Sequence, residues 1–485
     1  MLDIPVCVTN KLKGNCLGLA VLLVCAVVVH AQDAATLPAA PMPSRNVQTL
    51  PNGVTADPSG PLALSLDDAI DRGLQHNLNI LIAKQNELTV HGGLLSAGNA
   101  LLPNMNAVAK TATQQTNLAA MGFKASSLAG TGFSGAFNPI VKVDTTSLEL
   151  TINQALFNVP AYYLFRAAQK AEKGAELTTL NVRGGVVLQV GTYYLKALAD
   201  AAQIENARSL AKADAEVLRQ ATASHDAGVG TNLDVLRARV QLQNQQQVII
   251  QSESTFAKDK IALNRVIGLP ADQEIILSDT APYAECASLA HDDALAMAYT
   301  RRKDLLGLEA QIEVADQARK AIRAERFPAL GFGGYYGVVG ETRGLYHGSF
   351  VAQGTLSVPV FQEAQLRGER EVANAQLTAL RQQVASLKVS IDQQIRASML
   401  DVQSANELVK VAQSNAALAA EALQDATDRF TAGVEDNLPV IQAQATLAGA
   451  QTRLVQTLFQ YNQSKLQLAR NTGVVETQYK AYLGR

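Results

Sequence analysis

The chain has no tryptophan, few other aromatic residues and almost no net charge. Aromatic residues make up 5% of the 485 positions, and 41 Lys and Arg balance 43 Asp and Glu. A near-neutral balance provides no broad basic field for phosphates, so we expect no nucleic-acid partner. With 48% hydrophobic residues, the chain is also too apolar to be disordered.

Cysteine and histidine are too few and too poorly spaced for the common metal and redox sites. Three of the four cysteines lie in the first 25 residues, which leaves Cys286 without an intrachain partner. None of the six histidines forms an H-x-x-x-H pair. Ser224-His225-Asp226 does not form a catalytic triad, because adjacent residues do not place their side chains in a relay. We therefore expect no catalytic residue, no cofactor and no metal site.

The amino-terminus carries an apolar run that is typical of an export signal. Two lysines precede the run Leu17–Val29, and Ala31 completes a small-residue cleavage pattern. As a helix this run would rise about 20 Å, less than the ~30 Å apolar core of a bilayer. The sequence thus predicts a signal peptide at 1–31 and a proline-rich flexible lead-in at 32–61, without lipidation.

The rest of the chain contains an internal duplication. Asp67-Asp68-Ala69-Ile70 recurs 225 positions later as Asp292-Asp293-Ala294-Leu295. Gly228-Val229 recurs 205 positions later as Gly433-Val434, and Arg265-x-x-Gly268 recurs as Arg470-x-x-Gly473. Ordered matches with one change of spacing indicate a true repeat. We expect one repeat at 62–270 and another at 288–475, with a connector at 271–287 and a tail at 476–485.

Each copy has the same predicted order of elements. Apolar residues from Leu377 to Val402 recur every three or four positions, which predicts a very long helix. A helix over 362–430 would be about 100 Å long. The expected helical segments are about 64–100 and 288–326, the strands about 103–115, 146–157, 328–339 and 349–361, and the long helices about 160–225, 231–267, 362–430 and 436–472.

The predicted strands alternate apolar and polar residues. In the fourth, apolar residues from Phe350 to Val360 occupy one face, and Gln353, Thr355 and Ser357 occupy the other. This pattern is typical of a membrane barrel strand, and equally of a half-buried soluble strand. Four strands cannot close a barrel, and an open sheet edge in lipid leaves backbone groups unpaired. If these strands span a membrane, the chain must oligomerise.

The repeated phrases resemble the bacterial outer-membrane efflux protein family, the TolC-like outer-membrane factors. The resemblance covers about 62–475 and is carried by Leu66-Asp67-Asp68-Ala69-Ile70, by Ala227-Gly228-Val229-x-x-Asn232-Leu233-Asp234-Val235-Leu236 and Arg429-Phe430-Thr431-Ala432-Gly433, and by the two repeat endings near Gly268 and Gly473. It implies a mainly α chain with a small β part. Such a chain forms one third of a trimeric 12-stranded β-barrel, continued by a periplasmic α-helical barrel.

The same resemblance implies a function. The chain would be an outer-membrane channel of a tripartite efflux or type I secretion system, a passive conduit rather than an enzyme. Its partners would be two further copies of itself, outer-membrane lipid, a periplasmic adaptor protein and, through the adaptor, an inner-membrane pump. The alternative is an exported, soluble coiled-coil scaffold of the periplasm.

The turns at Gly228 and Gly433 are the candidate functional region. Glycine supplies the positive φ that ends a helix, and Asn232 or Asp436 can cap the next helix. By resemblance these turns form a periplasmic gate, for which Asp234, Glu435 and Asp436 are candidates. Pro439 and Gln442 stand where family members often carry Asp. Gly228, Val229, Leu233, Gly433, Val434 and Leu438 are candidates for adaptor docking, and packing within the tip is the other interpretation of these apolar side chains.

Overall fold

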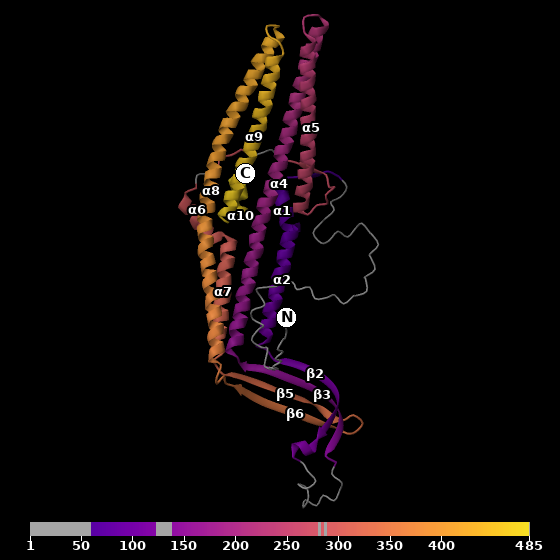
Figure 1. Ribbon diagram of the computed structural model, residues 1–485, viewed down its shortest axis with the longest axis vertical. Coiled ribbons are helices and arrows are strands. Elements are labelled where there is room, and N and C mark those ends of the chain that lie inside the picture. The colour runs from indigo at the N-terminus through magenta and orange to yellow at the C-terminus, as the bar shows by residue number, and fades with distance from the viewer. Residues whose placement is uncertain (1–59, 123–137, 280–282, 286–288, 485) are drawn as a thin grey trace, which may run out of the picture. The chain divides into compact units, whose positions relative to one another are not determined.

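A computed structural model of the chain describes residues 60–122, 138–279, 283–285 and 289–484, all within the compact unit Pro51–Arg485. The expected signal peptide, nearly all of the lead-in and Cys286 lie outside these residues. Long helices and one four-stranded sheet dominate the described part (Figure 1). No helix in these ranges combines the length and the hydropathy needed to cross a bilayer.

Four long helices form two hairpins. The first hairpin is α4 (Val159–Asp226) and α5 (Asn232–Ile267), and the second is α8 (Glu363–Thr431) and α9 (Leu438–Asn471). With 68 and 69 residues, α4 and α8 are each about 100 Å long. The first and last residues of all four helices lie within two positions of those expected from the sequence. The predicted apolar stripe of α8 is buried, with Ile391 and Ile395 fully enclosed.

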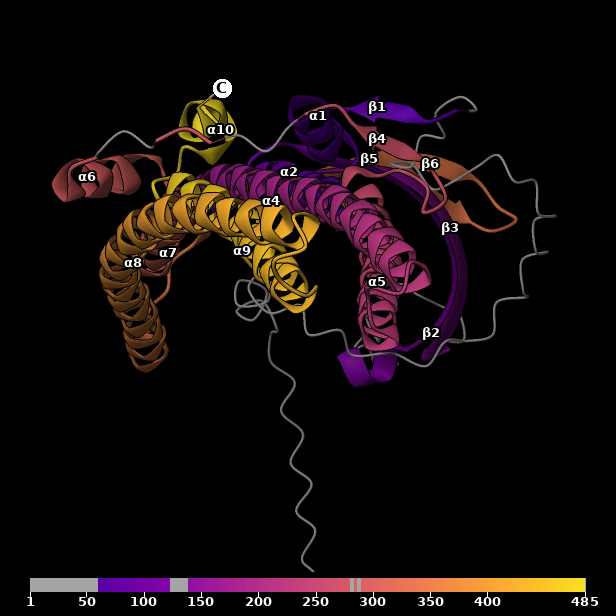
Figure 2. The same ribbon diagram turned by 90° about the horizontal axis from the view of Figure 1, so that it is seen from above.

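The hairpins pack side by side through α4 and α9, so that the order across the row is α8, α9, α4, α5. Figure 2 shows that this row is curved. The short elements α1 (Leu66–His76), α10 (Val475–Leu483) and β1 (Leu62–Leu64) lie on its convex side. The concave side of the row is left uncovered by these elements.

Each expected short helical segment is in fact two helices. The segment 64–100 contains α1 and α2 (Leu78–Asn99), and 288–326 contains α6 (His291–Arg301) and α7 (Lys303–Ala324). The break falls at Asn77 and at Arg302, both of which have extended backbone. Asn77 is buried, and its amide donates to the Val266 carbonyl oxygen at 2.8 Å, so a tertiary contact stabilises the break.

The sheet is antiparallel in the order β2 (Asn104–Asn117), β3 (Ile140–Phe157), β5 (Ala329–Glu341), β6 (Tyr346–Ser357). A short 3₁₀ helix, Leu118–Met121, follows β2. The expected continuation of the fourth strand to residue 361 is wrong, because β6 ends at Ser357. Pro359 lacks the N–H that the ladder requires, and Val360 is 91% exposed.

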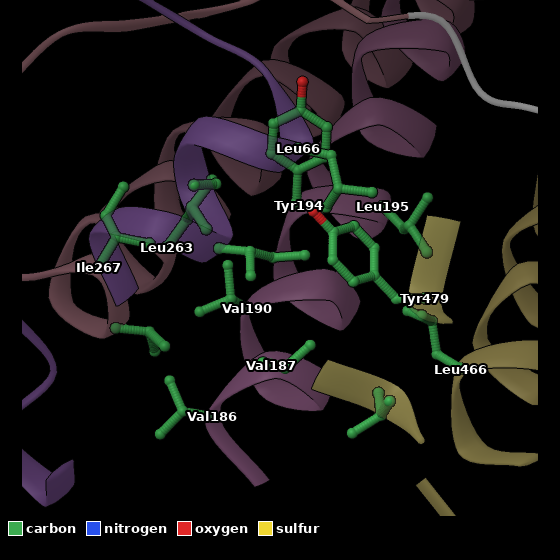
Figure 3. Packing of buried hydrophobic residues seen from close by; sticks show 14 of the residues in the cluster. Leu66, Val186, Val187, Val190, Tyr194, Leu195, Leu263, Ile267, Leu466 and Tyr479 are labelled. Atoms are coloured by element: carbon green, nitrogen blue, oxygen red, sulfur yellow. The ribbon is translucent and has the colours of Figure 1, made fainter. Parts of the chain in front are cut away.

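The main core lies where α1, α4, α5, α9 and α10 meet, beneath the parallel pair β1 and β4 (Ile275–Leu277). Figure 3 shows Val186, Val187 and Val190 of α4 directed toward side chains of neighbouring helices. The segment 476–485, expected as a tail, is mostly helix α10. Tyr479 and Leu483 of this helix are buried, because they complete the core rather than extend from it.

Candidate functional site at the hairpin tips

The two hairpin tips share one backbone geometry. Gly228 and Gly433 have φ of 76° and 73°, and each follows the last residues of a long helix. The amide of Val229 donates to the Ser224 carbonyl oxygen at 3.0 Å, and that of Val434 to the Arg429 carbonyl oxygen at 3.1 Å. This pattern satisfies carbonyl groups that a helix end would leave unpaired. The duplication therefore extends to the conformation of the turns.

The residue that caps α5 is Thr231, and the expectation of Asn232 is wrong. Thr231 has extended backbone, and its hydroxyl accepts from the Asp234 amide at 3.3 Å. The Asp234 carboxylate in turn accepts from the Thr231 backbone amide at 3.3 Å, which completes a capping box, and it also accepts from the Thr231 hydroxyl at 2.6 Å. At the second tip, the Asp436 carboxylate accepts from the Leu438 amide at 3.2 Å. Asp234 thus stabilises the start of its own helix.

The structure brings two of the three candidate acidic residues together. Arg237 lies 3.7 Å from the Asp234 carboxylate and 3.9 Å from the Asp436 carboxylate, which belongs to the other hairpin. Asn437 is fully buried, and its side-chain amide donates to the Asp234 carbonyl oxygen at 2.9 Å. These contacts connect the two tips.

Glu435 takes no part in that cluster. Its carboxylate lies 3.5 Å from Arg429, on the helix that precedes the turn. Sequence reasoning missed Arg237 and Asn437 as tip residues. A signal existed for Asn437, since it repeats Asn232 at the duplication spacing, but nothing in the sequence indicates that its side chain crosses to the other hairpin.

The candidate docking side chains are exposed in this chain. Val229 and Val434 are 83% and 75% exposed, and Leu233 and Leu438 are exposed to a smaller degree. The interior of the tips is filled instead by other residues, namely Val217, Ala221, Val235, Ala238 and Val440. Packing within the tip therefore does not account for the exposed four.

His225 belongs to the turn of the first tip. His225 does not contact a carboxylate in the described residues, and its Nδ1 lies 3.3 Å from the Gly230 carbonyl oxygen, as part of the turn. Across the ranges that the structure describes, no group of three His, Cys, Asp or Glu side chains is placed to hold a metal ion.

At the other end of the long helices, the sheet has two free edges. Within the described residues, β2 pairs only with β3, and β6 pairs only with β5. Many apolar side chains of these strands are exposed, among them Val108, Leu148, Tyr336 and Phe350. An exposed apolar sheet with unpaired edges can pair with strands of another chain.

The model of the outer membrane efflux protein family matches two segments of the chain, residues 69–269 and 294–474. Together these segments make up most of its length. The chain belongs to the outer membrane efflux protein family. The pyoverdine export outer membrane protein OpmQ of Pseudomonas aeruginosa is 24% identical over 402 residues, which cover 81% of this chain and 82% of OpmQ. The family is thus described by efflux, and this relative by export, at the outer membrane.

Solved structures of such channels have the same fold. The Campylobacter jejuni CmeC outer membrane channel superposes with a TM-score of 0.71 at 13% identity, over 84% of this chain and 86% of CmeC. CusC superposes with a TM-score of 0.69 at 15% identity, over 90% of this chain and 99% of CusC. This efflux protein therefore has the TolC-like fold and acts as a channel in the outer membrane. The alternative of a soluble scaffold is not supported by these matches.

Proposed function

We propose that three copies of this efflux protein form a passive conduit from the periplasm to the exterior. One observation carries this proposal: the four-stranded sheet has unpaired edges on β2 and β6 in the described residues and exposes apolar side chains. In lipid, unpaired N–H and C=O groups cost several kcal/mol each, so the edges must be joined. Three sheets of four strands supply the 12 strands of a closed barrel.

The row of helices, like the sheet, ends on both sides in exposed apolar surface. The outer helices of the row, α5 and α8, expose apolar side chains along their length, including Val240 and Ile250 of α5 and Val389 and Val411 of α8. If α5 of one copy packs against α8 of the next, both surfaces become buried and the helices close a ring. No catalytic step and no cofactor is required of such a wall.

The tips would form the periplasmic gate. Arg237 connects Asp234 to Asp436 of the neighbouring hairpin, so these contacts hold the two hairpins together. Any opening that separates the hairpins must break them. Carboxylates repeated in three copies near a common axis would favour cations and bind divalent ones.

Single-channel recording tests the gate. Asp234→Asn keeps an acceptor for the Thr231 hydroxyl but removes the charge that faces Arg237. We expect a larger conductance and about tenfold weaker block by a divalent cation, because one carboxylate per copy is lost. Asp226→Asn, an exposed carboxylate before the turn, is the matched control. Unchanged block in Asp234→Asn would remove this residue from the gate.

The exposed valines of the two tips would bind a periplasmic adaptor coupled to an inner-membrane pump. Val229→Asp combined with Val434→Asp places charges on this apolar contact. We expect export to fall at least about tenfold while the amount of protein in the outer membrane stays the same, since charge in an apolar contact costs several kcal/mol. Normal export by the double variant would show that the valines do not bind the adaptor.

A further inference from the structure

The helix α9 carries a single exposed charge, Arg453. The structure describes all of α9, in which Lys465 is buried and Arg470 is half-buried. No acidic residue occurs in this helix. In the described part of the chain, Arg453 pairs with no carboxylate of the nearby α4, α5 or α8, whereas Arg208 of α4 and Arg396 of α8 each pair with one.

Arg453 lies at a groove of about 400 Å³ formed by α4, α5 and α9. Amide side chains line one part of the groove, among them Asn206 and Gln456, while the Gln203 amide already donates to the Thr452 hydroxyl at 2.9 Å. Leu210 and Val248 form an apolar part. The lining contains no acidic residue, so the guanidinium is the only charge that a bound molecule would meet.

A second groove of about 420 Å³, between α8 and α9, also reaches Arg453. Its lining is mainly apolar and includes Leu418, Ala419 and Ala450, again without a carboxylate. The Arg453 guanidinium therefore lies between a groove that is lined partly by amides and a groove that is lined mainly by apolar side chains.

The first groove opens on the concave face of the helix row. The Tyr194 hydroxyl of α4 donates to the Leu64 carbonyl oxygen of β1 at 2.9 Å, so this side of α4 faces the convex elements. Gln203 follows nine residues later, or two and a half helical turns, and therefore lies on the opposite side. The convex side holds β1, α1 and α10 (Figure 2). In a closed ring the concave face would line the conduit.

We propose that this groove is a binding site for small organic carboxylates, with Arg453 pairing with the carboxylate and the apolar walls contacting the organic body. A guanidinium matches the two oxygens of a carboxylate, and neighbouring amides supply further hydrogen-bond donors. Arg453 lies fifteen residues beyond Leu438, about 22 Å from the start of α9, so the site is inside the conduit rather than at its gate. The inference rests on the proposed conduit only for that placement, because one chain supplies the whole groove.

Binding of dansylglycine, a fluorescent organic carboxylate, tests the site. The protein is held in lipid nanodiscs. Dansylglycinamide, the neutral amide of dansylglycine, serves as the uncharged probe. We expect Arg453→Gln to raise the Kd for dansylglycine about fivefold, since a partly exposed ion pair is lost. The amide should bind the wild type as weakly as the acid binds Arg453→Gln.

Lys212→Gln is the matched control. Lys212 is exposed and lies nine residues beyond Gln203, so it is on the other side of α4 from the groove. We expect this variant to bind dansylglycine as the wild type does. No binding by the wild type, equal affinity for acid and amide, or an equal loss in Lys212→Gln would overturn the proposal. Failure of the protein to conduct ions would contradict the conduit and leave the binding result unaffected.

Discussion

At the scale of single residues, the most unusual group is the buried carboxylate of Asp214. It is only 2% exposed. It lies on α4 between Leu210, which packs with Leu447, and Val217, which packs with Val440. Burial in this layer raises the pKa of Asp214 to about 6, and the Gln241 amide opposes the shift only in part.

Asp214→Asn should therefore stabilise the protein in a pH-dependent way. The folded-state pKa is above the unfolded value of about 4, so ionisation destabilises the fold increasingly from about pH 4 and fully above about pH 6. We expect the variant to gain about 1–3 kcal/mol of unfolding free energy above pH 6 and little near pH 4. Denaturant unfolding across this range measures the difference. The exposed Asp401→Asn should show no such trend, and a parallel pH profile in both variants would contradict the account.

Two glycines with the same backbone conformation should differ in their tolerance of alanine. Gly228 and Gly473 have φ of 76° and 78°. A Cβ at Gly228 would meet nothing within 4 Å, but at Gly473 it would lie 2.8 Å from the Arg302 amide nitrogen. We expect Gly228→Ala to cost about 1 kcal/mol and Gly473→Ala about 2–4 kcal/mol. Equal unfolding midpoints for the two variants would be inconsistent with this packing.

The same scale shows what the sequence reveals and what it leaves hidden. Gly228 and Gly433 could be predicted as turns, because left-handed backbone has few alternatives to glycine and the two sites repeat. The sequence could not predict whether Thr231 or Asn232 caps α5, because both residue types cap helices well. The contact of Arg237 with Asp436 depends on the packing of two hairpins about 200 positions apart in the chain.

At the scale of elements, α10 joins the carboxyl-terminal end to the core. Leu483 is fully buried, and the Tyr479 hydroxyl donates to the Asp67 carboxylate of α1 at 2.7 Å. We expect Leu483→Ala to destabilise the protein by about 2–4 kcal/mol, because it leaves a cavity. Lys480→Ala removes an exposed ion pair with Asp67 and a cation–π contact with Tyr479, and it should cost about 1 kcal/mol or less. Thermal unfolding and protease sensitivity of the terminus measure both, and equal effects would show that α10 does not dock as described.

Elements with a long regular pattern could be predicted and short ones could not. The spacing from Leu377 to Val402 specifies a helix over many turns, so the bounds of α8 follow closely. In contrast, α10 has only nine residues, which is too few for periodicity to separate helix from tail. The breaks at Asn77 and Arg302 depend on partners far along the chain, such as the Val266 carbonyl oxygen.

At the scale of the whole molecule, one chain has surfaces that it cannot cover itself. The sheet presents two unpaired edges in the described residues, and the helix row ends at α5 and α8 with exposed apolar side chains. Both are explained if neighbouring copies join edge to edge. The curvature of the row in Figure 2 is of the kind that a closed ring needs.

The mass of the native complex tests this account most directly. Outer membranes are extracted with a mild detergent, and the complex is weighed by native mass spectrometry, with a salt wash lacking detergent as the parallel sample. We predict a mass of three chains, found only in the detergent extract. A single chain that leaves the envelope in the salt wash would contradict the central claim.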